Sequence, residues 1–274
     1  MRGSTPLLVA CGVWLGLALL GPLVAPWSWR AQDREAVFQP PSLLSQHHHP
    51  PHWLGTDGYG RDEFSRVLDG ARSSLLLYLA MAVPPLLLAF GIGVASALWP
   101  AADALFTSLG EIARSLPWIF VLLAVRAALP LDTGTPQLVL ALAGLFTLAS
   151  WPVPAWVFRG AARELLRRDF LVAARLSGAG PLRLLVRHIW PNLRPLAMVW
   201  LALLVAAAAL AEVGLAMIGL GLPQPVPTWG NMLAALRDIF AIRDWWLYSP
   251  LVFLIPLLTC LNLYAGTQAS RSRE

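Results

Sequence analysis

Long apolar runs dominate this chain, and most of its polar residues gather in the segments between them. Each run has roughly the 20 residues that a helix needs to cross the hydrocarbon core of a bilayer. The pattern therefore predicts an all-α membrane protein with six transmembrane helices. The predicted spans are residues 7–26, 74–98, 104–129, 137–158, 196–220 and 247–266.

The first run follows a single basic residue, Arg2, so it also has the outline of a secretory signal peptide. Pro26 would lie beside any small-residue cleavage site and would disfavour cleavage there. An uncleaved membrane anchor is therefore favoured. With this anchor as the first of six spans, the two termini lie on the same side of the membrane.

The arginines indicate which side that is. Residues 159–194 hold eight arginines against only Glu164 and Asp169, whereas residues 27–73 hold five arginines against six acids. Basic residues concentrate in short cytoplasmic loops of membrane proteins. We therefore expect residues 159–194 and both termini in the cytoplasm, and residues 27–73 on the outer side.

The composition agrees with a chain that folds in lipid. It is 57% hydrophobic and only 13% charged, against about 25% charged residues in a typical soluble domain. The net charge of +5 comes from clustered arginines, so membrane orientation explains it better than nucleic-acid binding. Because the chain contains no lysine, it cannot carry the phosphate-binding P-loop motif. A nucleotide that powers this protein would have to be bound by another subunit.

One short stretch within the arginine block has the pattern of an amphipathic helix. Small or apolar residues recur there at helical spacing, at Phe170, Ala173, Ala174, Ser177 and Gly178. This helix is too short and too charged to span a bilayer. Its small face needs a partner, and a cytoplasmic protein is the natural candidate.

Several charged residues fall inside predicted spans, and Glu212, Glu111 and Arg114 are candidates for the pathway. Glu212 lies deep in the fifth span, where a carboxylate is costly unless it faces a cavity or finds a partner. Two interpretations stay open for it, a polar group lining a translocation pathway and a structural residue hydrogen-bonded between helices. Glu111 and Arg114 are three residues apart in the third span, which favours a neutralised structural pair over a pathway role.

Catalytic and metal-binding motifs are weakly represented. His47, His48, His49 and His52 form the one metal-like cluster, but no carboxylate is interleaved and two prolines follow, so a solvated loop is favoured over a metal site. Neither H-E-x-x-H nor G-x-S-x-G occurs. We expect no catalytic residue, no metal ligand and no cofactor bound by this chain.

Three separated stretches carry a resemblance that covers nearly the whole chain. Together they resemble the inner-membrane permease subunits of ATP-binding-cassette (ABC) importers, specifically the C-type permease of the dipeptide, oligopeptide and nickel group. They read HWLGTDGYGRDEFSRVLDGARSSL (residues 52–75), DFLVAARLSGAGPLRLLVRHIWPN (residues 169–192) and AEVGLAMIGLGLPQPVPTWGNML (residues 211–233).

The resemblance implies the type I importer permease fold, with a coupling helix over residues 169–178 that docks in a cleft of the cytoplasmic ATPase. The chain departs from the family at Val172, commonly glutamate, and at Trp190, commonly leucine. The C-terminal tail also lacks the usual aspartate-containing ending. The ATPase-coupling residues implied by the resemblance are Phe170, Ala173, Ala174, Ser177, Gly178, His188, Pro191 and Asn192.

The resemblance further implies a division into an anchor with an outer loop (residues 1–73) and a permease domain (residues 74–274). The expected partners are a homologous permease, two cytoplasmic ATPases that bind the ATP, and an extracytoplasmic binding protein, all at the bacterial inner membrane. The substrate would be a peptide or a related small solute, nickel chelates included. The alternative is an ion-coupled secondary transporter that uses Glu212 as its protonation site.

Overall fold

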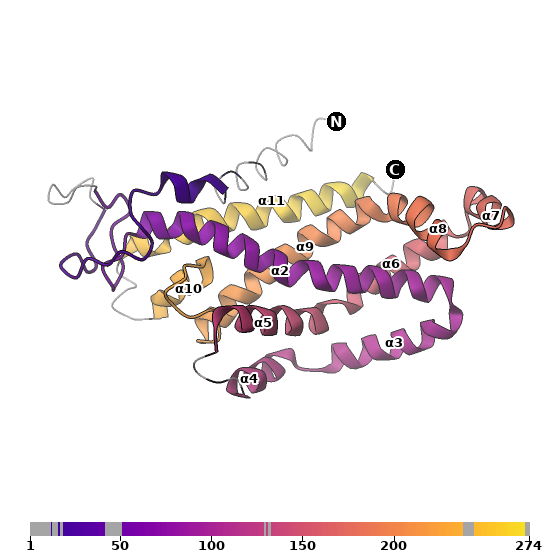
Figure 1. Cartoon of the computed structure of the whole chain (residues 1–274), viewed down its shortest axis with the longest axis horizontal. Helices are drawn as coiled ribbons and strands as arrows, with labels where there is room; N and C mark the ends of the chain where they lie inside the picture. Colours follow the sequence, from indigo (N-terminus) through magenta and orange to yellow (C-terminus); the bar gives the residue numbers. More distant parts are fainter. Residues whose placement is uncertain are drawn as a thin grey trace. The chain divides into compact units, whose positions relative to one another are not determined.

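The computed structural model describes residues 12, 16, 19–41, 51–128, 130, 133–237 and 244–271, and within them it contains helices and loops but no β-strand. This confirms the all-α fold class. Figure 1 labels the helices α2 to α11. They are α2 (Glu63–Leu98), α3 (Pro100–Ser115), α4 (Trp118–Ala128), α5 (Thr135–Ser150), α6 (Pro152–Leu165), α7 (Asp169–Leu176), α8 (Pro181–Leu184), α9 (Trp190–Met217), α10 (Trp229–Leu233) and α11 (Ser249–Arg271), with the π-helix η2 (Leu185–Ile189) and the 3₁₀-helices η3 (Ala234–Arg237) and η5 (Trp245–Tyr248).

Three stretches of helix in the described residues are long and apolar enough to cross a membrane, namely Glu63–Leu98, Pro181–Met217 and Trp245–Gln268. A fourth span is present if α5 and α6, which are bent by 51° at their junction, are counted together. Half of the first predicted span, residues 7–26, lies outside the described residues. The total of six spans therefore stays a prediction.

The third predicted span, residues 104–129, is divided between α3 and α4. The chain leaves the helix at Leu116, which has extended backbone angles (φ −75°, ψ 130°) and directly precedes Pro117. A proline disfavours helical angles in the residue before it, and it lacks the N–H that would continue the helix. Pro152 acts similarly, because it begins α6 directly after the bend. Pro84 and Pro85, in contrast, lie inside α2 without ending it.

The described chain forms two compact units. Unit 1 consists of residues 1–79, 134–139 and 206–267, and unit 2 of residues 80–133, 140–205 and 268–274. Helices α2 and α9 contribute to both units, so neither unit is one continuous segment. The expected division at residues 73 and 74 stays a prediction.

Unit 2 has an apolar core where α2, α6 and α9 meet. Phe158 of α6 is fully buried, and the edge of Phe90 of α2 contacts its ring at 5.5 Å between centroids. Gly93 allows the close approach of the two helices, because a Cβ there would lie 2.6 Å from the Ala155 carbonyl oxygen. The buried members of this core are Ala89, Val94, Trp151, Ala155, Phe158, Ala162, Leu166, Ile189, Leu193 and Ala197.

Candidate functional site

The predicted amphipathic helix is present in unit 2 as α7. Arg168 precedes it with extended backbone angles (φ −72°, ψ 140°), and Asp169 in the first turn places a carboxylate near the positive end of the helix dipole. Gly178 ends it in the left-handed conformation (φ +81°). The Gly178 N–H donates to the Arg175 carbonyl and the Ala179 N–H donates to the Ala174 carbonyl. These two bonds are the Schellman arrangement that commonly closes a helix, and they explain the glycine.

Most of the α7 surface is uncovered in the chain. Leu171 is fully buried and attaches the helix, whereas Leu176 is 85% exposed and Phe170 is 47% exposed. Ala173 is exposed and Ala174 is half-buried. A cluster of exposed apolar side chains on a charged cytoplasmic-type loop is typical of an interaction surface.

The structure brings the more distant members of the predicted coupling set to α7. The His188 ring lies 6.3 Å from the Phe170 ring, centroid to centroid, and the Asn192 side-chain amide donates to the His188 carbonyl at 2.7 Å. Pro191 is exposed beside them. Ser177 is also exposed, and its hydroxyl donates to the Ala173 carbonyl at 2.9 Å. The predicted residues therefore surround one helix and its supporting turn.

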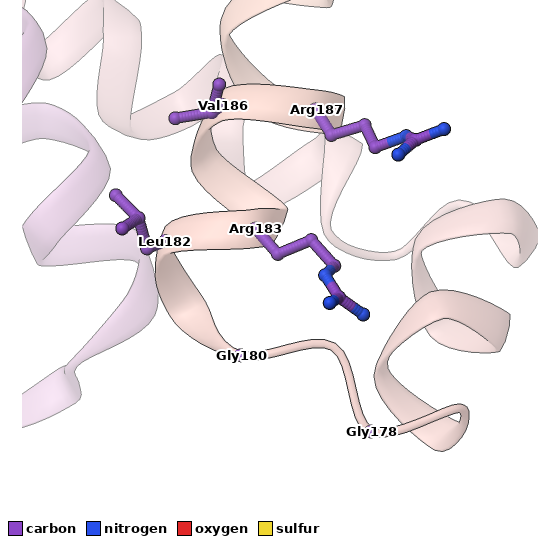
Figure 2. A pocket seen from close by; sticks show the side chains of 6 residues that line it. All are labelled: Gly178, Gly180, Leu182, Arg183, Val186 and Arg187. Carbon is purple, nitrogen blue, oxygen red and sulfur yellow. The ribbon is translucent and has the colours of Figure 1, made fainter.

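An open groove of about 620 Å³ lies next to α7 and has both apolar and basic walls. Figure 2 shows the side chains of Arg183 and Arg187 extending to one side of the α8–η2 segment, and those of Leu182 and Val186 extending to the other. We call this feature the arginine groove. Its lining residues are Gly178, Gly180, Leu182, Arg183, Val186 and Arg187.

Three of the eight arginines of the block are used inside the chain. Arg159 and Arg163 of α6 bind Asp103 of α3 at 2.8 and 2.7 Å, and Arg168 pairs with Glu164 at 2.9 Å. The hydrogen bond from Arg163, with the one from Arg159, holds the pKa of Asp103 below its usual range. Sequence reasoning missed Asp103, although an acid at the start of an apolar span signals a basic partner.

Asp103 thus connects α3 and α6 through both arginines. In the described part of the chain, no ion pair involves the other five arginines of the block. These five are Arg167, Arg175, Arg183, Arg187 and Arg194.

The predicted pair between Glu111 and Arg114 is wrong. The ion pairs of the described residues do not include it, and both side chains are exposed. The Arg114 guanidinium lies instead 4.7 Å above the ring of Trp156 in α6. An aromatic face attracts a cation without requiring an acid. Trp156 of α6, and not Glu111, is therefore the partner of Arg114.

Glu212 is 1% exposed in unit 1 and is surrounded by hydrogen-bond donors. The Thr228 hydroxyl donates to Oε1 at 2.6 Å, the Tyr78 hydroxyl donates to Oε2 at 3.4 Å, and the Gly230 N–H also binds the carboxylate. This geometry matches the structural interpretation of Glu212, because the carboxyl group does not reach the surface of the chain. Glycine is required at 230, because a Cβ there would overlap the carboxylate.

A second buried polar network in unit 1 was not predicted. Asp57 binds Arg61 at 2.6 Å and lies 3.6 Å from Arg66, and both guanidinium groups donate to the side-chain oxygen of Gln224, at 3.0 and 2.9 Å. Arg66 is 1% exposed. The pairing joins residues more than 150 positions apart, so no local spacing could signal it.

His52 corrects the expectation of a solvated histidine loop. It is buried, its Nδ1 lies 2.9 Å from an Asp62 carboxylate oxygen, and its ring stacks on Trp27. The other three histidines, His47, His48 and His49, lie outside the described residues. Within the described residues, no group of three or more His, Cys, Asp or Glu side chains could hold a metal ion.

Comparison with known proteins identifies the class to which this arrangement belongs. Residues 65–274 match the family of binding-protein-dependent transport system inner membrane components. The chain is 36% identical over 250 residues to a putative peptide permease protein of Brucella suis biovar 1 (strain 1330), covering 89% of this chain and 76% of that protein. It is 37% identical over 245 residues to the di/tripeptide transport system permease protein DppC of Pseudomonas aeruginosa (strain UCBPP-PA14), covering 89% and 77%.

The chain therefore belongs to the family of binding-protein-dependent transport system inner membrane components, and it is a multi-pass permease subunit of an ABC importer. This confirms the resemblance drawn from its three motifs. The family is a transport family and not an enzyme family.

Proposed function

We propose that this permease imports peptides, and that ATP hydrolysis in separate cytoplasmic subunits drives it through α7. The single observation that carries the coupling role is the exposure of apolar side chains on α7. Leu171 is the one fully buried residue of this short helix, whereas Phe170 and Leu176 are 47% and 85% exposed. Exposed apolar area of this kind is stable in an aqueous compartment when a partner covers it.

The substrate class follows from the relatives. Those named above are described as peptide or di/tripeptide permeases, and each aligns with 89% of this chain. Uptake of di- and tripeptides is the direct test. Nickel chelates, which the resemblance also allows, have no support in the names of these relatives.

The proposed complex contains this chain, a homologous permease, two ATPase subunits and an extracytoplasmic binding protein. The ATPases bind the ATP, since the chain has no lysine for a P-loop. This chain carries out no covalent chemistry and holds no cofactor. Both of its termini lie in the cytoplasm with the arginine block, as the arginine distribution favours.

The ion-coupled alternative assigns Glu212 a cycle of protonation. Its hydrogen bonds to Thr228, Tyr78 and Gly230 favour a fixed structural role instead. Peptide uptake into vesicles distinguishes the two mechanisms. Uptake that requires ATP and does not depend on a proton gradient supports the ABC importer. Uptake that requires a proton gradient and no ATP supports the ion-coupled transporter.

The coupling role is tested by Ala174→Arg on α7. A charged, longer side chain cannot enter a packed protein cleft without strain or desolvation, so we expect the variant to reach the membrane but to lose its ATPase subunits. The matched control is Gly160→Arg, at an exposed position of α6 where a Cβ meets nothing within 4 Å. ATPase co-purification and peptide uptake are measured for both.

A second variant, Gly178→Trp, adds bulk at the end of the same helix. Its backbone has φ +81°, so the substitution also strains the C-cap, and the thermal stability of the variant must be measured alongside. Normal ATPase binding and normal uptake in both variants would remove α7 from the coupling mechanism.

A further inference from the structure

Apart from Gly178, the residues that line the arginine groove have no part in the proposed coupling role of α7. It adjoins α7 at Gly178 and continues along α8 and η2, with α7 and α8 in contact. Arg183 and Arg187 are both exposed and lie about one helical turn apart. Neither forms an ion pair with any described residue.

The charge around the groove is one-sided. Asp169 is the only acid in residues 169–194, and it lies at the opposite end of α7 from Gly178. Two guanidinium groups without an acid between them attract a carboxylate strongly, because arginine offers paired N–H donors that match the two carboxylate oxygens.

The groove is also open enough to accept side chains. Its volume of about 620 Å³ lies within the range of protein sites that enclose ligand groups. A Cβ at Gly178 or Gly180 would meet nothing within 4 Å, so backbone and not side chains borders that part of the groove. Leu182 and Val186 add apolar surface, and they are 73% and 60% exposed.

We infer that the arginine groove binds an acidic segment of the cytoplasmic ATPase subunit, with its carboxylates on Arg183 and Arg187. This inference rests on the proposed docking of α7. Because the groove and α7 are continuous, a protein that covers one also covers the other. An anionic lipid headgroup would satisfy the arginines but would leave the exposed apolar residues of α7 without a partner.

The test measures the affinity of the co-expressed, purified ATPase subunits for the two-permease complex in nanodiscs made only of neutral phosphatidylcholine. The charge-reversed double variant R183E/R187E should bind the ATPase at least about tenfold more weakly, since it replaces attraction by repulsion. R183Q/R187Q should lie between that variant and the wild type. The matched control is Arg194→Glu, an exposed and unpaired arginine of the same loop that does not line the groove.

Two further readouts separate a charge contact from a structural effect. Binding of the wild type should weaken as salt rises, and binding of R183Q/R187Q should depend less on salt. An acid-to-lysine substitution on the docking face of the ATPase should restore binding to R183E/R187E while weakening binding to the wild type. Melting temperatures of the variants should equal that of the wild type, because both arginines are exposed.

Each contrary result has a distinct meaning. Wild-type affinity in R183E/R187E overturns the inference. A defect that appears only when anionic phosphatidylglycerol is present assigns the groove to a lipid headgroup, and that also overturns it. If Ala174→Arg loses the ATPase while R183E/R187E keeps it, the coupling role of α7 stands and only the groove assignment fails. If Ala174→Arg also binds normally, the proposed coupling itself fails.

Discussion

Two pairs of arginines, one pair in each unit of this permease, have opposite environments. In unit 1, Arg61 and Arg66 are buried, and each is held by Asp57 and Gln224. In unit 2, Arg183 and Arg187 are exposed and pair with no described residue. Buried paired charges hold distant segments in one arrangement, whereas exposed unpaired charges remain available to a partner. The difference agrees with the proposal that Arg61 and Arg66 hold internal structure, whereas Arg183 and Arg187 serve docking.

The outer loop of unit 1 (residues 27–73) and the arginine block of unit 2 (residues 159–194) are predicted on opposite sides of the membrane. Thiol labelling of the two segments should therefore give an all-or-none difference. In a background with Cys11 and Cys260 replaced by serine, Tyr59→Cys of unit 1 should react with a membrane-impermeant thiol reagent added to intact spheroplasts. Gly180→Cys of unit 2 should not react until the cells are opened. Both positions are exposed, so access to the reagent and not burial decides the labelling.

The reverse labelling pattern would invert the topology, and it would place α7 on the side of the membrane that has no ATPase. Labelling of both positions from outside would show that the spheroplasts leak.

Removing a buried charge should have the largest energetic effect. Arg66→Ala leaves Asp57 and Gln224 with only one of their two guanidinium partners, Arg61. Breaking a buried charge pair costs about 3–5 kcal/mol of folding stability. The matched control is Arg72→Ala, six residues further along α2 at an exposed position. Thermal unfolding of the purified permease compares the two, and equal melting temperatures would show that the network of unit 1 contributes nothing.

Glu212 should tolerate a change of charge but not a loss of polarity. Glu212→Gln keeps an acceptor for Thr228 and should leave stability and uptake near those of the wild type. Glu212→Leu leaves the buried hydroxyl and N–H groups unpaired, at a cost of about 1–3 kcal/mol. Gly230→Ala should be similarly destabilising, about 1–3 kcal/mol, because its Cβ would overlap the carboxylate.

Melting temperature and peptide uptake, measured on the same preparations, separate the two roles considered for Glu212. Reduced uptake in a stable Glu212→Gln variant would support the other interpretation, in which Glu212 lines the translocation pathway.

The partly exposed ion pairs of unit 2 should contribute least. Asp103→Asn removes the attraction to Arg159 and Arg163 and should cost less than about 1 kcal/mol. The pKa of Asp103 is lowered in the folded chain, so the stabilisation is present above the ordinary aspartate pKa and is lost as pH falls through the lowered one. The difference in melting temperature between wild type and Asp103→Asn should therefore be present at neutral pH and vanish in strong acid.

Features that depend on neighbouring residues were predictable from the sequence. Apolar runs of membrane length predicted the helical fold, and small residues at helical spacing predicted α7 with Gly178 at its end. The breaks at Pro117 and Pro152 also have a local cause, because a missing N–H acts on the adjacent turn. At Pro84 and Pro85 the surrounding helix continues through both residues, so the same local rule was insufficient there.

Features that depend on distant residues were decided by the tertiary structure alone. Arg66 donates a hydrogen bond to Gln224, and Arg114 lies over the ring of Trp156 instead of pairing with Glu111. His52 becomes buried against Trp27 and Asp62. A charged or polar side chain takes whichever partner packing brings within about 3–4 Å, and sequence spacing reports such neighbours only within a turn or two of the same helix. The type of each element was therefore local information, whereas the partner of each buried charge was set by how the helices pack.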